Sequence, residues 1–232
     1  MKNLIVGAGI SGLYLAYKLL LNGVASENII IFERSERIGG RIYTHEYCGY
    51  KYSAGAGRLG KKHKYVTKLI NDFNLQEQII NINKNNNYYV DGKLYNEEQL
   101  LKRYKSQYKN LNDLWKYAIE KKINKNKYDL NKYNLDNYFS LILPTNEVEL
   151  LKISLGYIAE FYDMNAKNGL LTLQKDFDVK NKDFYVLRDG IHILCDVLYN
   201  YIKDAGVNIK LSSTLEDIYD DKKYIIVNGI LY

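Results

Sequence analysis

Three glycines near the amino terminus constrain the fold of this chain more than any other feature. Gly7, Gly9 and Gly12 stand in the spacing G-x-G-x-x-G, directly after residues 2–6, which end in the apolar run Leu4-Ile5-Val6. From Ile10 onward, apolar side chains recur at the spacing of one helix face. The pattern predicts a strand, a tight turn and a helix. A secretory signal peptide or a membrane helix would have its apolar core interrupted by these glycines, so both are disfavoured.

A second strand completes the unit. Residues 28–32 are nearly all apolar, as expected of a parallel strand that is buried on both faces. Glu33 follows directly, about 20 positions after Gly12, which is the arrangement of a dinucleotide-binding site. Gly7 permits the turn, and Gly9 lets a pyrophosphate approach the backbone. Gly12 lets the helix pack closely on the strand.

The start of this helix is suited to anions. Its first N–H groups have no partner within the helix, and the positive end of the helix dipole points toward the same place. We expect the Glu33 carboxylate to accept hydrogen bonds from both hydroxyls of an adenosine ribose. The carboxylate would repel a 2'-phosphate, so NADP is disfavoured as the ligand.

Bulk composition excludes several function classes. A chain of 232 residues holds one or two domains at about 100–200 residues each. The formal charge of +6 comes from lysines scattered among asparagines and acidic residues, so we expect a solvated surface and no nucleic-acid partner. Cys48 and Cys195 have neither C-x-x-C nor metal-ligand spacing, so we expect no metal site and a cytoplasmic location.

A second glycine turn follows Glu33. Residues 34–44 contain three arginines and the pair Gly39-Gly40, where the backbone can approach a ligand and Arg41 can form a forked contact with phosphate oxygens. A surface turn with solvated arginines is the competing interpretation. Together with residues 7–12 and Glu33, the run Arg37-x-Gly39-Gly40-Arg41 resembles the amino-terminal half of the flavin-containing amine oxidase family. The resemblance implies FAD as cofactor, with Glu33 at the ribose and Arg41 along the pyrophosphate.

Residues 50–63 are similar to a glycine-rich segment that runs close to the flavin ring in this family. The Gly-x-x-Arg pattern that ends at Arg58 resembles the L-amino-acid oxidase branch, in which this arginine binds the substrate carboxylate. A contact with the flavin or a purely structural role are the alternatives for Arg58. Motif and resemblance together give these cofactor-binding residues: Gly7, Gly9, Ile10, Ser11, Gly12, Glu33, Arg34, Gly39, Gly40, Arg41, Gly55, Ala56, Gly57, Arg58 and Leu215.

The fold class that follows is α/β, a Rossmann-like FAD-binding domain with an inserted, mainly helical substrate domain. We expect the FAD-binding domain to occupy residues 1–75 and to return at 183–232, with the substrate domain at 76–182. In the insert, apolar spacing predicts helices at 97–108, 110–122, 135–143 and 146–161, and it favours core packing of Trp115 over an aromatic cage for an amine. The dipeptides Asp91-Gly92 and Asn228-Gly229 predict hairpins, and further signals predict a helix opened by His63, a helix after Gly190 and a strand at 207–211.

The expected function is FAD-dependent oxidation of a primary or secondary amine or an L-amino acid to the imine, with hydride transfer to the flavin and production of hydrogen peroxide from O2. The sequence stops at Tyr232 inside a hairpin, whereas members of the family continue further. An inactive FAD-binding remnant, or half of a split oxidase with a complementing chain, is therefore an alternative. A desaturase or a flavin mutase is another, because these share the first glycine motif. No catalytic residue is assigned.

Overall fold

The computed structural model describes residues 2–60, 63–82, 86–121, 128–156, 158–176, 184–219 and 224–232. The chain forms two compact units, Met1–Ile82 with Asp183–Tyr232, and Asn83–Lys182. The first unit continues to Ile82 rather than residue 75, because β6 (Ile79–Asn81) pairs with β9 (Phe184–Leu187). Among the described residues, no helix has both the length and the apolar character needed to cross a membrane.

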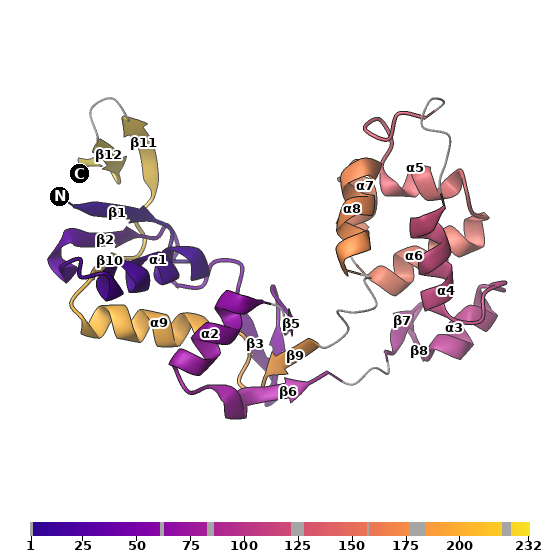
Figure 1. Ribbon diagram of the computed structural model, residues 1–232, viewed down its shortest axis with the longest axis horizontal. Helices are drawn as coiled ribbons and strands as arrows, with labels where there is room; N and C mark the ends of the chain where they lie inside the picture. Colours follow the sequence, from indigo (N-terminus) through magenta and orange to yellow (C-terminus); the bar gives the residue numbers. More distant parts are fainter. Residues whose placement is uncertain are drawn as a thin grey trace. The chain divides into compact units, whose positions relative to one another are not determined.

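A parallel sheet is the frame of the first unit (Figure 1). Strands β1 (Asn3–Val6), β2 (Ile29–Phe32) and β10 (Asn208–Lys210) lie in the order β1-β2-β10, and helix α1 (Ile10–Leu21) connects the first two. All residues of the central strand β2 are buried, which confirms its prediction from an apolar run. The Rossmann-like fold expected from the sequence is confirmed.

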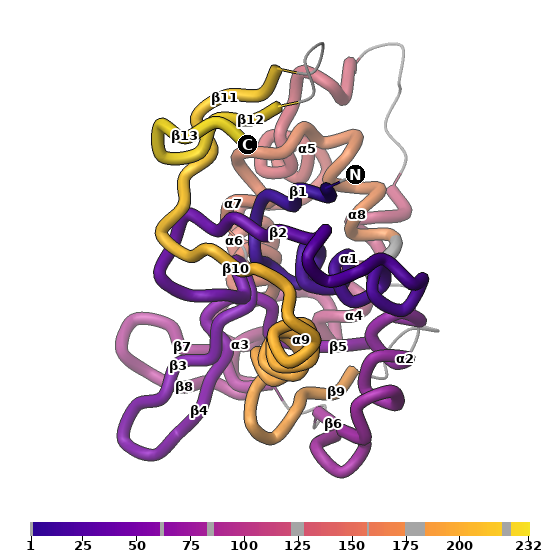
Figure 2. Tube along the Cα trace, turned by 90° about the vertical axis from the view of Figure 1, so that its left-hand side faces the viewer, coloured from indigo at the N-terminus to yellow at the C-terminus, as the bar shows by residue number. Residues whose placement is uncertain are grey.

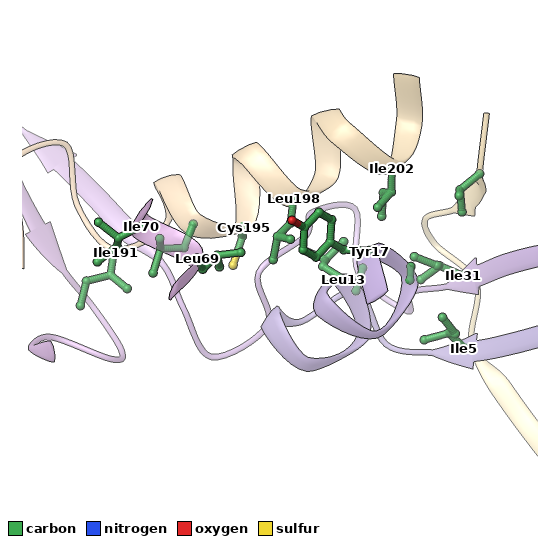
Figure 3. Close-up of a cluster of buried hydrophobic side chains, with 14 of the residues drawn as sticks. Ile5, Leu13, Tyr17, Ile31, Leu69, Ile70, Ile191, Cys195, Leu198 and Ile202 are labelled. Carbon is green, nitrogen blue, oxygen red and sulfur yellow. The ribbon is translucent and has the colours of Figure 1, made fainter. Parts of the chain in front are cut away.

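The helices of this unit pack through one apolar core. Helix α9 (Ile193–Asp204) lies on α1, and Figure 3 shows Leu198 of α9 directed toward Leu13 and Tyr17 of α1. Both leucines are fully buried. Helix α2 (Lys64–Asp72), with His63 at its N-cap as predicted, adds Leu69 and Ile70 to the same core. The core therefore joins segments from both ends of the chain.

Smaller sheets surround this frame. Strand β9 lies between β5 (Leu59–Gly60) and β6, so it joins the segments before and after the second unit. The predicted carboxy-terminal hairpin is present as β12 (Tyr224–Val227) and β13 (Ile230–Leu231), next to β11 (Leu215–Tyr219). The ring of Tyr232 packs on Phe32 of β2 at 4.7 Å between centroids, which brings this end of the chain beside the central sheet (Figure 2).

Some elements of the first unit were not predicted. Strands β3 (Thr44–Tyr47) and β4 (Tyr50–Ser53) form a hairpin whose turn residues Cys48 and Gly49 have φ of 50° and 78°. Two single 3-10 turns, η1 (Ser26–Asn28) and η2 (Gln76–Gln78), precede β2 and β6.

The second unit is mainly helical. It begins with the hairpin of β7 (Tyr88–Val90) and β8 (Lys93–Tyr95), confirmed with positive φ at Asp91 and Gly92. The ring of Trp115 is buried and contacts Phe139 and Phe161, which confirms its place in the core. The helices are α3 (Glu97–Arg103), α4 (Leu111–Glu120), α5 (Leu135–Ser140), α6 (Thr145–Leu155), α7 (Ile158–Tyr162) and α8 (Ala166–Asp176).

The prediction of one continuous helix over residues 146–161 is wrong. Helix α6 ends at Leu155, because Gly156 takes the left-handed conformation with φ of 76°, and α7 begins at Ile158. Glycine reaches this conformation without steric cost and commonly ends helices. Helix α8 was not predicted.

Candidate functional site

The first glycine turn links β1 to α1 with little space between them. Gly7 has φ of 99° and donates its N–H to the carbonyl of Phe32 at 2.7 Å. A Cβ at Gly12 would lie 2.0 Å from the carbonyl oxygen of Gly7, so only glycine fits there without a backbone shift. Gly9 is the N-cap of α1 and has no side chain to bond the first N–H groups of the helix. The helix start is therefore open to an external acceptor.

The second glycine turn lies against the first. Gly39 donates its N–H to the carbonyl of Ala8 at 2.9 Å, and Gly39 and Gly9 form a parallel bridge. A Cβ at Gly40 would lie 3.4 Å from the Cα of Gly9. Behind the turn, a Cβ at Gly39 would lie 2.7 Å from Nε2 of His192, so the turn sits between the first glycine loop and α9. Two separate glycine motifs thus form one surface.

The segment at residues 54–56 closes a third side. The N–H groups of Ala54 and Ala56 donate to the carbonyls of Tyr43 and Arg41 at 2.9 and 3.3 Å. A Cβ at Gly55 would lie 2.0 Å from the Arg41 carbonyl oxygen, so this segment packs directly on the second turn.

The three segments surround a cavity of about 820 Å³. Volumes of this order are typical of sites for small molecules and cofactors. The cavity brings together most of the residues predicted from the two glycine motifs and places the start of α1 at its wall. Its lining residues are Val6, Gly7, Gly9, Ile10, Ser11, Gly12, Gly39, Arg41, Ile42, Ala54, Gly55 and Ala56.

Some predicted residues lie outside this lining. Gly40 contacts Gly9, as described above. Arg34 is exposed, and so are Gly57 and Arg58. The guanidinium carbon of Arg58 lies 4.7 Å from the ring centroid of Phe184, so the arginine stacks on β9. Leu215 opens β11, opposite Val227, and packs beside Ile30 and Phe32.

Glu33 also lies outside this lining; it is bonded to Ala8 of the first glycine turn and has 7% of its surface exposed. Its Oε2 accepts the N–H of Ala8 at 2.8 Å. Its Oε1 accepts both the N–H and the Oγ–H of Ser35, at 2.9 and 2.7 Å. Burial acts to raise the pKa of Glu33, but the hydrogen bonds from Ser35 and Ala8 and the charge of Arg34 outweigh it, so the pKa lies below its ordinary value. Glu33 is therefore ionised at neutral pH.

Ser35 is a structural member of the site that the sequence did not indicate, and Arg37, which belongs to the second glycine motif, has contacts that the motif did not specify. The Ser35 hydroxyl lies 2.7 Å from the carbonyl oxygen of Arg37 as well as from Glu33. The Arg37 guanidinium donates to the carbonyls of Ile38 and Gly40 at 3.1 and 2.9 Å and so holds the second turn closed. Bonds from a side-chain oxygen to the N–H two residues later are common for Asp, Asn, Ser and Thr, and because position 33 is a glutamate, the sequence carried no such signal for this contact. The carbonyls of Ile38 and Gly40 come within reach of Arg37 only when the turn has formed, so no spacing in the sequence indicates these bonds.

The arrangement can hold a charged, extended ligand. Open N–H groups at the start of α1 and the Arg41 side chain suit a pyrophosphate, and a buried carboxylate suits a neutral donor such as a sugar hydroxyl. Among the described residues, no three His, Cys, Asp or Glu side chains gather as they would around a metal ion.

Comparison with curated proteins finds that the chain is similar to L-amino-acid oxidases. The L-amino-acid oxidase BmooLAAO-I of Bothrops moojeni is 27% identical over 259 aligned positions, which cover 96% of this chain and 51% of that protein. An L-amino acid oxidase of Cerastes cerastes is 38% identical over 89 positions, 37% of this chain and 17% of that protein. The chain spans about half the length of the curated relatives it matches over its full extent.

Solved structures show a related fold. A putrescine oxidase bound to putrescine superimposes with a TM-score of 0.65 over 98% of this chain and 55% of the other, at 15% identity. At this identity the similarity concerns the fold alone. The sequence profile of one family, described as flavin containing amine oxidoreductase, matches residues 10–224. This chain, with its paired glycine turns and buried Glu33, therefore belongs to the flavin containing amine oxidoreductase family.

Proposed function

We propose that this chain forms the FAD-binding part of an oxidase that converts an amine or an L-amino acid to the imine. The observation that carries the proposal is the cavity of about 820 Å³ at which both glycine turns meet, with Glu33 ionised at the end of β2. The family implies a flavin cofactor.

The residues present fit the adenosine and pyrophosphate part of FAD. Added Cβ atoms at Gly12 and Gly55 would meet backbone oxygens at 2.0 Å, so these glycines permit the close packing that shapes the cavity. Gly9 leaves the backbone accessible at the start of α1, where a phosphate would meet free N–H groups. Arg41 lines the same cavity and can bond two phosphate oxygens at once. Glu33 would take the ribose.

Bound flavin would supply the redox chemistry, accepting a hydride from the carbon that carries the amine and passing electrons to O2 to give hydrogen peroxide. The described residues of this chain contribute binding and orientation. Arg41 and the helix start fix the charged part of the cofactor, and the two turns, tied through Gly39 and Ala8, set its direction along the cavity.

Arg58 is the residue that we propose to bind the carboxylate of an amino-acid substrate. Arg58 is exposed, and its guanidinium carbon lies 4.7 Å from the centroid of the Phe184 ring on β9. A guanidinium forms a bidentate pair with a carboxylate, which a simple amine lacks. Arg58 would therefore distinguish amino acids from amines.

The proposal is tested by measuring peroxide release from L-amino acids, monoamines and diamines. The protein is isolated from its native source, and its flavin content is determined first. Arg58→Ala should raise the KM for amino acids and leave amine turnover unchanged, and Arg58→Lys should restore part of the loss. Arg188→Ala is the matched control, because Arg188 is also exposed and bonds the carbonyl of Glu77. If amines and amino acids respond equally to Arg58→Ala, the carboxylate role is refuted. A flavin-loaded protein that oxidises none of these substrates would refute the oxidase assignment.

A further inference from the structure

We propose that the second unit carries an anion site of its own, in a cavity between the hairpin of β7 and β8 and helix α3. The ligand class is a small molecule that carries a phosphate group with two negative charges. The inference concerns only the second unit and does not depend on the nucleotide site or on the proposed oxidase activity.

The cavity has a volume of about 350 Å³, which is enough for a small phosphate-bearing molecule. Strand β8 forms one wall and helix α3, which follows it in the chain, forms the other (Figure 1). Half of the lining residues are cationic, and none is acidic. The lining consists of Lys93, Leu94, Tyr95, Gln99, Lys102 and Arg103.

The polar groups of this lining are available as hydrogen-bond donors. The side-chain oxygen of Gln99 already accepts the N–H of Asn96 at 3.0 Å, so its amide NH2 is the part left to bond a ligand. The Tyr95 oxygen accepts a bond from Nη1 of Arg103 at 3.0 Å, which leaves the Tyr95 hydroxyl proton to be donated. With their acceptor positions used in this way, both side chains offer protons to the cavity. An anion, which only accepts hydrogen bonds, is the ligand that such a lining suits.

The charges at the cavity sum to the opposite of a phosphate dianion. Arg103 forms an ion pair with Asp91 at 2.5 Å, and Asp91 is not part of the lining, so this pair adds no net charge. Among the described residues, neither Lys93 nor Lys102 has a hydrogen-bond or ion-pair partner, and both are exposed. The two lysines therefore supply a net charge of about +2, and a phosphate group carries nearly two negative charges at neutral pH.

Arg103 is held in place before any ligand arrives. Besides its bonds to Tyr95 and Asp91, its guanidinium carbon lies 5.3 Å from the centroid of the Tyr95 ring and 6.0 Å from that of Tyr104. A guanidinium has five N–H donors, and the two bonds to Tyr95 and Asp91 leave others for a phosphate oxygen. A donor that is already ordered loses little conformational freedom on binding.

Titration of the ¹⁵N-labelled full chain with inorganic phosphate at pH 8, followed by residue-resolved NMR, tests the inference. Acetate, which carries a single charge, is the comparison at equal ionic strength. We expect saturable shifts of the backbone amides of residues 92–103, with phosphate bound about tenfold or more tightly than acetate. No saturable shift in this range, or equal affinities for phosphate and acetate, would overturn the inference. The amides of residues 7–12 report separately on the first glycine turn, and phosphate shifts confined to these residues would also overturn it.

A double variant, Lys93→Gln with Lys102→Gln, tests whether the two lysines supply the charge. It should weaken phosphate binding at residues 92–103 by about tenfold or more, because charge-assisted bonds are lost. The matched control is Lys116→Gln with Lys132→Gln, which removes the same charge from two exposed lysines of the same unit that lie outside the lining. The control should bind phosphate within about twofold of the natural protein. Equal weakening in both double variants would reveal a general effect of net charge and would overturn the assignment of the site.

Discussion

Replacing Gly12 by alanine is expected to force helix α1 away from strand β1. The new Cβ would lie 2.0 Å from the Gly7 carbonyl oxygen and 3.3 Å from Cγ2 of Ile5. Real Cβ atoms essentially never approach another heavy atom closer than 3.0 Å, so helix and strand must separate by about 1 Å at this point. The nearest atom is the backbone oxygen of Gly7, which belongs to no side chain, so a rotamer change cannot relieve the strain.

The expected loss of stability is about 3 kcal/mol, the upper part of the range for overpacked cores. This corresponds to a decrease in Tm of about 6–12 °C for a protein of this size. Urea denaturation and thermal melting followed by far-UV circular dichroism measure both quantities.

Gly57→Ala is the matched control for this measurement. A Cβ at Gly57 would meet nothing closer than 3.8 Å, and its φ lies outside the left-handed region. We expect the control to change the free energy of unfolding by less than about 0.5 kcal/mol. If Gly12→Ala is as stable as Gly57→Ala, the contact between α1 and β1 is not as tight as the structure gives it, and the reasoning about the first glycine turn is wrong.

Three further predictions concern Glu33, the cysteines and the core. The pKa of Glu33 in the folded protein lies below its ordinary value of 4.5, so the unfolded chain binds the proton more readily. The stabilisation from ionised Glu33 is therefore complete above pH 4.5 and is lost as the pH falls through the folded pKa. In urea titrations over this acid range, Glu33→Gln should lose less stability than the natural protein. Burial, followed by the negative charge of Asp196, raises the pKa of the Cys195 thiol to about 12, so a thiol reagent at pH 8 should modify only the exposed Cys48. Mass spectrometry of a Cys48→Ser variant should then show no adduct. Leu198→Ala should cost about 2–5 kcal/mol of unfolding free energy, because Leu198 is fully buried between α1 and α9, whereas the half-exposed Leu15→Ala should cost far less; equal losses would contradict the packing of α9 on α1.

Local patterns were enough to predict the centre of the fold. The strand β1, the glycine turn and α1 follow from spacing within about 20 residues, and β2 follows from one apolar run. The hairpins at Asp91-Gly92 and Asn228-Gly229 follow from turn residues that readily take positive φ. In each of these cases, the residues that determine the structure are neighbours in sequence.

The features that the sequence did not reveal depend on distant contacts or on single conformations. Strand β9 pairs with β5 and β6 across the inserted unit, and no local signal reports such a pairing. The hairpin of β3 and β4 turns at Cys48, which is not a typical turn residue but has φ of 50° here. The break at Gly156 lies within apolar spacing that continues on both sides.

The same distinction applies to the site. Most residues of the two glycine motifs were predicted and do line one cavity, because the motifs themselves require close backbone approach. The contact of Gly39 with His192 links segments that are far apart in sequence, and no pattern within either segment indicates it. The roles proposed for Glu33, Arg41, Arg58 and Leu215 stay predictions until a ligand is bound.

Identification of the bound cofactor decides whether the two glycine turns and Glu33 form an FAD site. The protein is purified, incubated with FAD, freed of excess by gel filtration, and its released cofactor is measured by visible absorbance and mass spectrometry. We expect FAD in an equimolar amount with the chain and a strong loss of FAD in Glu33→Ala, which removes the carboxylate at the end of β2. A protein that retains no FAD after this treatment, or one that retains as much FAD in Glu33→Ala as in the natural chain, would contradict it.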